Sequence, residues 1–471
     1  MTRILPLLVC LLALLPFPAV ARLAGPPENW QQPSEARDLA QIRRTGVLKV
    51  LVNQSRNSSG EVKGQAIGVE YHRIRAFEQF LNRDGRSLEV RIIPRPKDQL
   101  AAALLRGEGD LVAPGELLDP RATSDVSASA PVREHVPLVL VARTGDRRFQ
   151  GLEQLAGRVV TLPAGSGAAE AVRKVNRQLA QRHLAPIAIE WVDPSLAVED
   201  VLEMVQAGIY SMTVVEQPIA ERWAKVLPKL RIDRHLVLDN QRDMTWYVRR
   251  DAPMLRASID RFLATYKTPA DQDATFQRVY RRLYKVRYPL ARADRQRLEK
   301  VRPVLQRFAA EHALDWLSLA AVAYKESSLN PGARGASGAT GLMQITPAAA
   351  RSVGVGDIHV LDKNVQASAR YMAKLRKGFF SSAQLNERER MAFVLAAYNV
   401  GPQRVQSLRA EARRRGLNPN QWFFQVERVA AEQLGMGVVS YVSAVNKYYL
   451  AYARERDDLE RQVRVASRGR K

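Results

Sequence analysis

Residues 323–345 read Ala-Tyr-Lys-Glu-Ser-Ser-Leu-Asn-Pro-Gly-Ala-Arg-Gly-Ala-Ser-Gly-Ala-Thr-Gly-Leu-Met-Gln-Ile. Just before and into this stretch, residues 315–325 carry apolar side chains at spacings of three and four, which predicts an amphipathic helix. Asn330, Pro331 and Gly332 predict its end. Glu326 therefore falls on the apolar face, where the helix meets a glycine-rich loop. Burial there raises the pKa of a carboxyl, so Glu326 is a candidate proton donor near neutral pH; the alternative is an ordinary solvated glutamate.

Three short motifs occur in order in the C-terminal half: Glu326-Ser327, Gly341-Leu342-Met343-Gln344 and Ala397-Tyr398-Asn399. Together they closely resemble the motif set of the lytic murein transglycosylases, which have a goose-type lysozyme-like catalytic domain. The resemblance covers residues 294–450. It implies that Glu326 protonates the bond between N-acetylmuramic acid and N-acetylglucosamine. The same residue would then act as base on the C6 hydroxyl, which gives a 1,6-anhydromuramoyl end without water.

The resemblance also implies that several residues near Glu326 bind the glycan strand. Hydrogen bonds to acetamido and hydroxyl groups suit Ser327 and Gln344, and the later helix would bring Tyr398 and Asn399 to face Glu326. For Met343 and Tyr441 plain core packing is an equal alternative to a place in the saccharide groove. The substrate-binding residues that the family implies are Ser327, Met343, Gln344, Tyr398, Asn399 and Tyr441.

The number of acidic residues in the motif stretch bears on the mechanism. Most glycosidases use two carboxylates, but the motif stretch holds only Glu326. One carboxyl suffices if the substrate supplies the nucleophile. A hydrolytic muramidase would need a second acid near Glu326, for which Asp357 and Asp362 are the candidates. A third alternative, from another class, is a non-catalytic solute-binding or sensory protein.

The N-terminal half has a different pattern, in which strands alternate with helices over residues 45–268. The order resembles the two-lobed periplasmic solute-binding domain of the amino-acid-binding type. That resemblance implies that Arg121 holds a ligand carboxylate and Glu216 an amine, although the family usually has Asp at the latter position. The alternative for Arg121 is a solvated surface residue. Gly165-Ser166-Gly167 is either a plain turn or an anion site at a helix N-terminus.

The fold class predicted for the whole chain is multidomain: a two-lobed α/β periplasmic-binding-protein-like domain, then an all-α, lysozyme-like catalytic domain. In the first domain we expect strands over 46–52 and 88–93, helices over 168–181 and 198–207, and a return of residues 236–248 to the first lobe. In the second, a 3.6-residue period predicts helices over 364–377, 387–397, 403–415, 421–433 and 438–454, and the resemblance implies that Asn364 lies in a packing helix. This layout resembles the membrane-bound lytic transglycosylase F type. The expected divisions are a signal peptide (1–21), a leader (22–44), the solute-binding-like domain (45–268), a basic connector (269–293), the catalytic domain (294–453) and a charged tail (454–471).

The first residues predict export from the cytoplasm. Arg3, an apolar run over 4–15 and Ala19-Val20-Ala21 form a signal peptide pattern. The single cysteine, Cys10, lies inside that run, so the mature chain is expected to have no disulfide. The six histidines (72, 135, 183, 235, 312 and 359) have no ligand spacing, and no metal or other cofactor is expected.

The formal net charge of +24 is uneven, with +6 in residues 22–268 and +17 in residues 269–471. Such a surface suits a polyanion. Peptidoglycan, with its stem-peptide carboxylates, and an anionic membrane surface are the expected partners, and nucleic acid is not, because an exported chain rarely meets it. The expected location is the periplasm, peripheral to the outer membrane. A muropeptide or an amino acid is the candidate ligand of the N-terminal domain.

Overall fold

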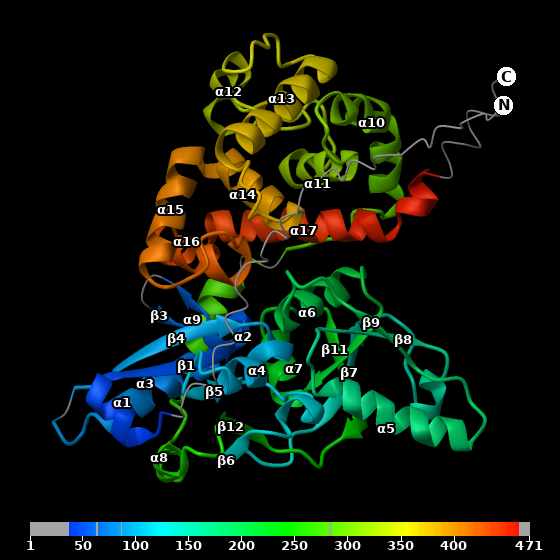
Figure 1. Cartoon of the computed structure of the whole chain (residues 1–471). Coiled ribbons are helices and arrows are strands. Elements are labelled where there is room, and N and C mark those ends of the chain that lie inside the picture. Colours follow the sequence, from blue (N-terminus) through cyan, green and yellow to red (C-terminus); the bar gives the residue numbers. More distant parts are fainter. Residues whose placement is uncertain (1–36, 63–64, 86, 282, 284, 461–471) are drawn as a thin grey trace, which may run out of the picture.

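The computed structural model describes residues 37–460, apart from residues 63–64, 86, 282 and 284. The predicted signal peptide with Cys10, most of the leader and the last residues of the charged tail lie outside the described residues. Figure 1 shows the α/β half below the helical half. Among the described helices, none is both long and apolar enough to cross a membrane.

Lobe 1 is built on a five-stranded sheet whose strands run in the order β4-β1-β5-β12-β6. β1 is parallel to both neighbours, whereas β12 is antiparallel to β5 and β6. β1 reads Val-Leu-Lys-Val-Leu-Val-Asn, and its alternate residues face opposite sides of the sheet. Val50 packs in a core with Phe77 and Trp246, while Leu51 packs in another with Leu100. The strands are β1 (Val47–Asn53), β4 (Glu89–Arg95), β5 (Leu111–Ala113), β6 (Ser127–Arg133) and β12 (Met244–Val248).

Short elements and helices complete lobe 1 on both faces of this sheet. They are α1 (Leu39–Thr45), α2 (Arg56–Ser59), β2 (Glu61–Val62), β3 (Gln65–Ala66), α3 (Val69–Leu81), α4 (Leu100–Leu105) and α8 (Pro253–Leu263).

Lobe 2 has an antiparallel sheet in the order β10-β7-β11 and a parallel pair, β8 and β9. The chain crosses between the lobes twice, and the two crossings meet where Val136 N–H donates to the Arg242 carbonyl at 2.9 Å. The prediction that residues 236–248 return together to lobe 1 is half right, because β11 stays in lobe 2 and only β12 crosses. The elements are β7 (Leu138–Arg143), β8 (Val159–Leu162), α5 (Ala168–Gln181), β9 (Ala188–Trp191), α6 (Val198–Ala207), β10 (Met212–Glu216), α7 (Gln217–Ala224) and β11 (Leu230–Asp239).

The connector forms helix α9 (Gln272–Tyr280), which packs on lobe 2. Phe276 and Tyr280 are buried against Trp223 of α7, with ring centroids 4.9 and 5.3 Å from that indole. Arg278 and Arg281 face solvent. The connector is therefore a solvated helix on one face only, and its aromatic face joins the two halves of the chain.

The catalytic half is helical, and its long last helix runs along the side that faces the lobes (Figure 1). The helix predicted over residues 421–433 is confirmed only in its second part, α16 (Glu427–Gln433), and is wrong in its first part, over 421–426. Phe423 and Phe424 have non-helical backbone angles there, because the Glu389 carboxylate accepts the N–H groups of Trp422 and Phe423 at 2.6 and 3.4 Å. The elements are α10 (Arg292–Glu311), α11 (Trp316–Ser327), α12 (Pro347–Arg351), α13 (Leu361–Phe379), α14 (Glu387–Val400), α15 (Pro402–Arg414), η5 (Trp422–Val426), α16 (Glu427–Gln433) and α17 (Met436–Arg454).

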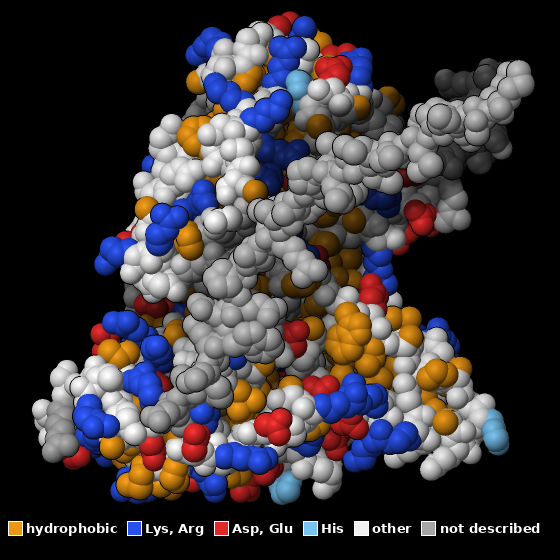
Figure 2. Space-filling view, viewed as in Figure 1, with side chains coloured by type: hydrophobic (Ala, Val, Ile, Leu, Met, Phe, Trp, Pro, Cys, Tyr) orange, Lys and Arg blue, Asp and Glu red, His pale blue; other side chains and the backbone are white. Residues whose placement is uncertain are grey.

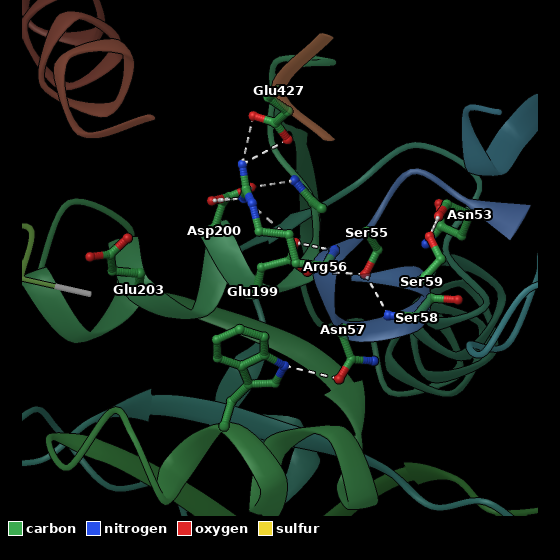
Figure 3. Close-up of polar contacts among 12 residues, drawn as sticks. Asn53, Ser55, Arg56, Asn57, Ser58, Ser59, Glu199, Asp200, Glu203 and Glu427 are labelled. Atoms are coloured by element: carbon green, nitrogen blue, oxygen red, sulfur yellow. Dashed lines mark hydrogen bonds and ion pairs between the residues drawn. The ribbon is translucent and has the colours of Figure 1, made fainter. Parts of the chain in front are cut away.

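A buried group of charges joins lobe 1, lobe 2 and the catalytic half (Figure 3). The Arg56 guanidinium, from α2, pairs with Asp200 of α6 at 3.2 Å and with Glu427 of α16 at 3.0 Å. Lys447 of α17 pairs with Asp200 at 2.6 Å and also with Glu203. Buried charges are costly unless paired, so these pairs hold the three parts in one arrangement.

Candidate active site

Glu326 is the penultimate residue of helix α11. The helix starts at Asp315, whose carboxylate caps it by accepting the Leu317 N–H at 3.0 Å. It stops where Ser328 and Leu329 take left-handed backbone angles, with φ of 53° and 61°. The apolar stripe buries the body of the helix, so the Glu326 carboxyl is partly buried at its end.

The partners of Glu326 are a tyrosine and a lysine. The Tyr441 hydroxyl, from α17, donates to Glu326 Oε1 at 2.7 Å. Lys325 Nζ lies 5.9 Å from the centre of the Tyr441 ring. Burial raises the pKa of Glu326, and the Tyr441 hydrogen bond and the Lys325 charge offset only part of that rise. The carboxyl therefore keeps its proton to a higher pH than an ordinary glutamate does, which suits a general acid.

The glycine-rich loop folds onto itself beside Glu326. Ser327 Oγ lies 2.8 Å from the Leu342 carbonyl oxygen and accepts the Asn330 N–H at 3.0 Å. The Gln344 amide donates to the carbonyls of Ala333 and Gly341 at 3.1 and 2.9 Å. Both side chains therefore hold the loop in shape.

Asn364 of α13 anchors the same loop through hydrogen bonds of its side-chain amide. Its Oδ1 accepts the Met343 N–H at 2.9 Å, and its Nδ2 donates to the carbonyls of Thr340 and Ile358 at 2.8 and 2.9 Å. Gly341 lies against it with φ of 76°, and a Cβ there would come within 2.4 Å of Asn364 Nδ2. Only glycine fits at residue 341 without moving the anchor.

Tyr398 of α14 ties the loop to the far side of the site. Its hydroxyl lies 2.9 Å from the Met343 carbonyl oxygen and 3.2 Å from Ser368 Oγ. Burial raises the pKa of Tyr398, and the negative charge of Glu326 adds to that rise. Two tyrosines from separate helices, Tyr398 and Tyr441, thus surround a single acid.

Comparison with known proteins supplies the family. Residues 304–421 match the family model described as the Transglycosylase SLT domain. The chain is 30% identical over 403 residues to "Membrane-bound lytic murein transglycosylase F" of Desulfosudis oleivorans, and the matched residues make up 82% of each chain. It is 28% identical over 436 residues to the protein of that name from Pseudomonas putida, with 87% of this chain and 86% of the other covered. The chain belongs to the membrane-bound lytic murein transglycosylase F family.

The N-terminal half is also similar to solved structures. One is "An ancestral arginine-binding protein bound to arginine", which is 19% identical, covers 50% of this chain and 97% of its own, and has a TM-score of 0.40.

The remaining residues of the transglycosylase motifs differ in how far they are buried. Met343 is fully buried, and its carbonyl oxygen accepts the hydrogen bond of the Tyr398 hydroxyl. Asn399 is exposed, one residue beyond Tyr398. Asp357 and Asp362 are both exposed, and Asp362 pairs with Arg307 of α10. The substrate-binding roles of Met343 and its neighbours stay predictions.

The ligand residues expected in the N-terminal half have separate partners. Arg121 is exposed and pairs with Glu170 at 3.5 Å. Glu216 is buried, and its Oε1 accepts the Leu117 N–H at 2.7 Å. The Gly167 N–H donates to the Leu117 carbonyl at 2.9 Å, so this donor is already used. Ligand binding by Arg121 and Glu216 stays a prediction.

Sequence reasoning missed the roles of two buried side chains. The family resemblance placed Asn364 in a packing helix, but two of its three hydrogen bonds reach Met343 and Thr340 of the glycine-rich loop, 21 and 24 residues away along the chain. Glu389 holds the irregular turn at Trp422, and burial raises its pKa to about 7. The only sign of either residue in the sequence is a polar side chain on an otherwise apolar helix face. Such a pattern does not show which group the side chain bonds to.

Proposed function

We propose that this transglycosylase cleaves the β-1,4 bond between N-acetylmuramic acid and N-acetylglucosamine in peptidoglycan without water. Glu326 donates its proton to the glycosidic oxygen as the bond to C1 breaks. The resulting carboxylate then takes the proton of the muramoyl C6 hydroxyl while that oxygen bonds to C1. The product is a 1,6-anhydromuramoyl end, and Glu326 is again protonated.

The observation that carries this proposal is a single partly buried acid whose pKa is raised. The groups that act on that pKa are a tyrosine hydroxyl and a lysine, not a second carboxyl. A hydrolase would need a second acid to activate water. The two candidates, Asp357 and Asp362, are solvent-exposed.

The deciding experiment digests purified sacculi and identifies the soluble products by mass spectrometry. We expect 1,6-anhydromuramoyl ends from the parent chain and loss of at least about a hundredfold in rate for Glu326→Gln. Asp362→Asn is the matched control, because it neutralises an exposed acid of the same domain that pairs with Arg307, and it should leave products and rate unchanged. Reducing muramoyl ends that disappear in Asp362→Asn or Asp357→Asn would identify a hydrolase instead. A folded Glu326→Gln variant with full activity would reject the assignment of the acid.

For partner and location, the proposed setting is the periplasmic face of the outer membrane. The net charge of +17 over residues 269–471 suits the carboxylates of peptidoglycan and an anionic membrane surface. Figure 2 shows Lys and Arg side chains spread over both halves on the face drawn, rather than gathered in one patch. Fractionation of cells that express the full chain, with a salt wash of the membranes, tests this: a peripheral protein leaves the membrane in high salt.

A further inference from the structure

A cavity of about 750 Å³ lies between lobe 1 and the catalytic half. Lobe 1 lines it with side chains of β1, β4, α2 and α3, and the catalytic half lines it with the C-terminal end of α15, with α16 and with the first turn of α17. The lining carries eight Lys and Arg side chains against four Glu side chains. The cavity therefore has an excess of positive charge, to which both halves of the chain contribute.

Most of these charged side chains already have a partner. Five of the eight cations form ion pairs with carboxylates: Arg56, Arg75, Arg91, Arg414 and Arg415. The other three form no ion pair with a carboxylate of the described residues, and they are Lys49 of β1, Arg413 of α15 and Arg428 of α16. Of the four glutamates, only Glu61 forms no ion pair within the part of the chain that the structure describes. The unpaired groups thus leave an excess of two positive charges.

Arg428 shows best that the protein alone does not compensate this charge. Its Nη1 donates to the carbonyl and to Oγ of Ser59 at 3.2 and 3.1 Å, which holds the guanidinium at the boundary between the two halves. Burial lowers the pKa of Arg428, and the charges of Glu61, Glu427 and Glu432, which lie beyond ion-pair distance, do not offset this. An anion in the cavity would supply the missing partner, because a buried charge is costly unless it is paired.

We propose that this cavity binds a small anion with at least two carboxylate or phosphate groups. The anion would lie between Lys49 of lobe 1 and the two arginines of the catalytic half, Arg413 and Arg428. Guanidinium groups suit such a ligand, because their N–H donors match the spacing of the oxygens of a carboxylate or a phosphate. The volume of the cavity is in the usual range of small-molecule sites. Because the anion would contact both halves, its binding stabilises the arrangement in which they are packed here.

The test titrates the full chain with citrate and, separately, with inorganic pyrophosphate, and it follows the heat of binding and the melting temperature. We expect saturable binding of at least one of them and a rise in melting temperature of about 1–3 °C. Sodium chloride and sodium acetate at the same ionic strength should give no saturable rise, since general salt effects grow without saturating. Binding of citrate alone assigns the site to carboxylates, and binding of pyrophosphate alone assigns it to phosphates.

Three single variants locate the site. Lys49→Gln, Arg413→Gln and Arg428→Gln should each weaken binding at least about tenfold, because each removes a hydrogen bond between charged groups. Arg413 is exposed, so its variant remains informative if Arg428→Gln does not fold. Arg182→Gln is the matched control, because Arg182 is outside the cavity lining, at the end of α5, and pairs with Glu153 at 3.9 Å. It should bind as the parent does.

Two results would overturn the proposal. The first is the absence of saturable binding of both citrate and pyrophosphate to the parent. The second is an affinity that is unchanged in the three cavity variants, or weakened equally in Arg182→Gln, because the anions would then respond to overall net charge. None of these measurements depends on cleavage of sacculi, so their outcome is separate from the role of Glu326.

Discussion

The hydrogen bond from Tyr441 to Glu326 gives the sharpest prediction, because it changes a rate in a known direction. The hydroxyl donates to the carboxylate at 2.7 Å and so favours the ionised form. In Tyr441→Phe that stabilisation is lost, and the pKa of Glu326 rises further above its ordinary value. A hydrogen bond to a charged group contributes about 1.5–3 kcal/mol, and 1.4 kcal/mol corresponds to about one pH unit. Because the acid stays protonated to higher pH, the alkaline limb of the activity profile should move upward by about one to two pH units.

The assay measures the initial rate at which the parent and the variant clear a sacculus suspension, over a range from about pH 4 to about pH 10. Tyr452→Phe is the matched control, since Tyr452 lies on the same helix and its buried hydroxyl has no hydrogen-bond partner among the described residues. In that variant the alkaline limb of the activity profile should lie at the same pH as in the parent. If the limb of Tyr441→Phe stays in place or moves to lower pH, the bond does not favour the ionised form of Glu326, and the reasoning is refuted.

Two further predictions concern the glycine-rich loop beside Glu326 and the turn at Trp422 that Glu389 holds. Gly341→Ala should lower the free energy of unfolding by about 1–3 kcal/mol for its backbone strain, and by more for its clash with Asn364. Gly354→Ala, with φ of 71° and open space around the new methyl, should cost the strain alone, so equal melting temperatures for the two would contradict the anchor. Burial raises the pKa of Glu389 from 4.5 to about 7, so the folded state holds the extra proton and the stability from this group is lost as pH rises between those values. Glu389→Gln should flatten that part of the curve of melting temperature against pH, and an unchanged slope would count against it.

Local patterns predicted much of the fold. Helices α5 and α6 begin and end at the residues expected from their spacing of apolar side chains, because a helix face turned to a core leaves a 3.6-residue period in the sequence. β1 and β4 were likewise evident as apolar runs between turn residues. Glu326 was recognisable because Glu326-Ser327 is followed in order by the Gly-Leu-Met-Gln and Ala-Tyr-Asn motifs that resemble those of the transglycosylases.

The sequence by itself determined which faces of the helices and strands are apolar, and it placed Glu326 at the end of an apolar helix. Only the tertiary structure decided which polar groups are buried and what they bond to. Tyr441 reaches Glu326 across 115 residues of chain, and no pattern along the sequence records that pairing. The expected helix over 421–433 begins only at Glu427, because a distant carboxylate, Glu389, accepts the N–H groups of Trp422 and Phe423 and holds a turn with non-helical angles before it. Composition alone assigns Lys97 to solvent, yet Lys97 is buried and its ammonium forms an ion pair with the buried carboxylate of Glu116. Periodicity reports burial, whereas the compensation of each buried charge depends on which segments the fold brings together.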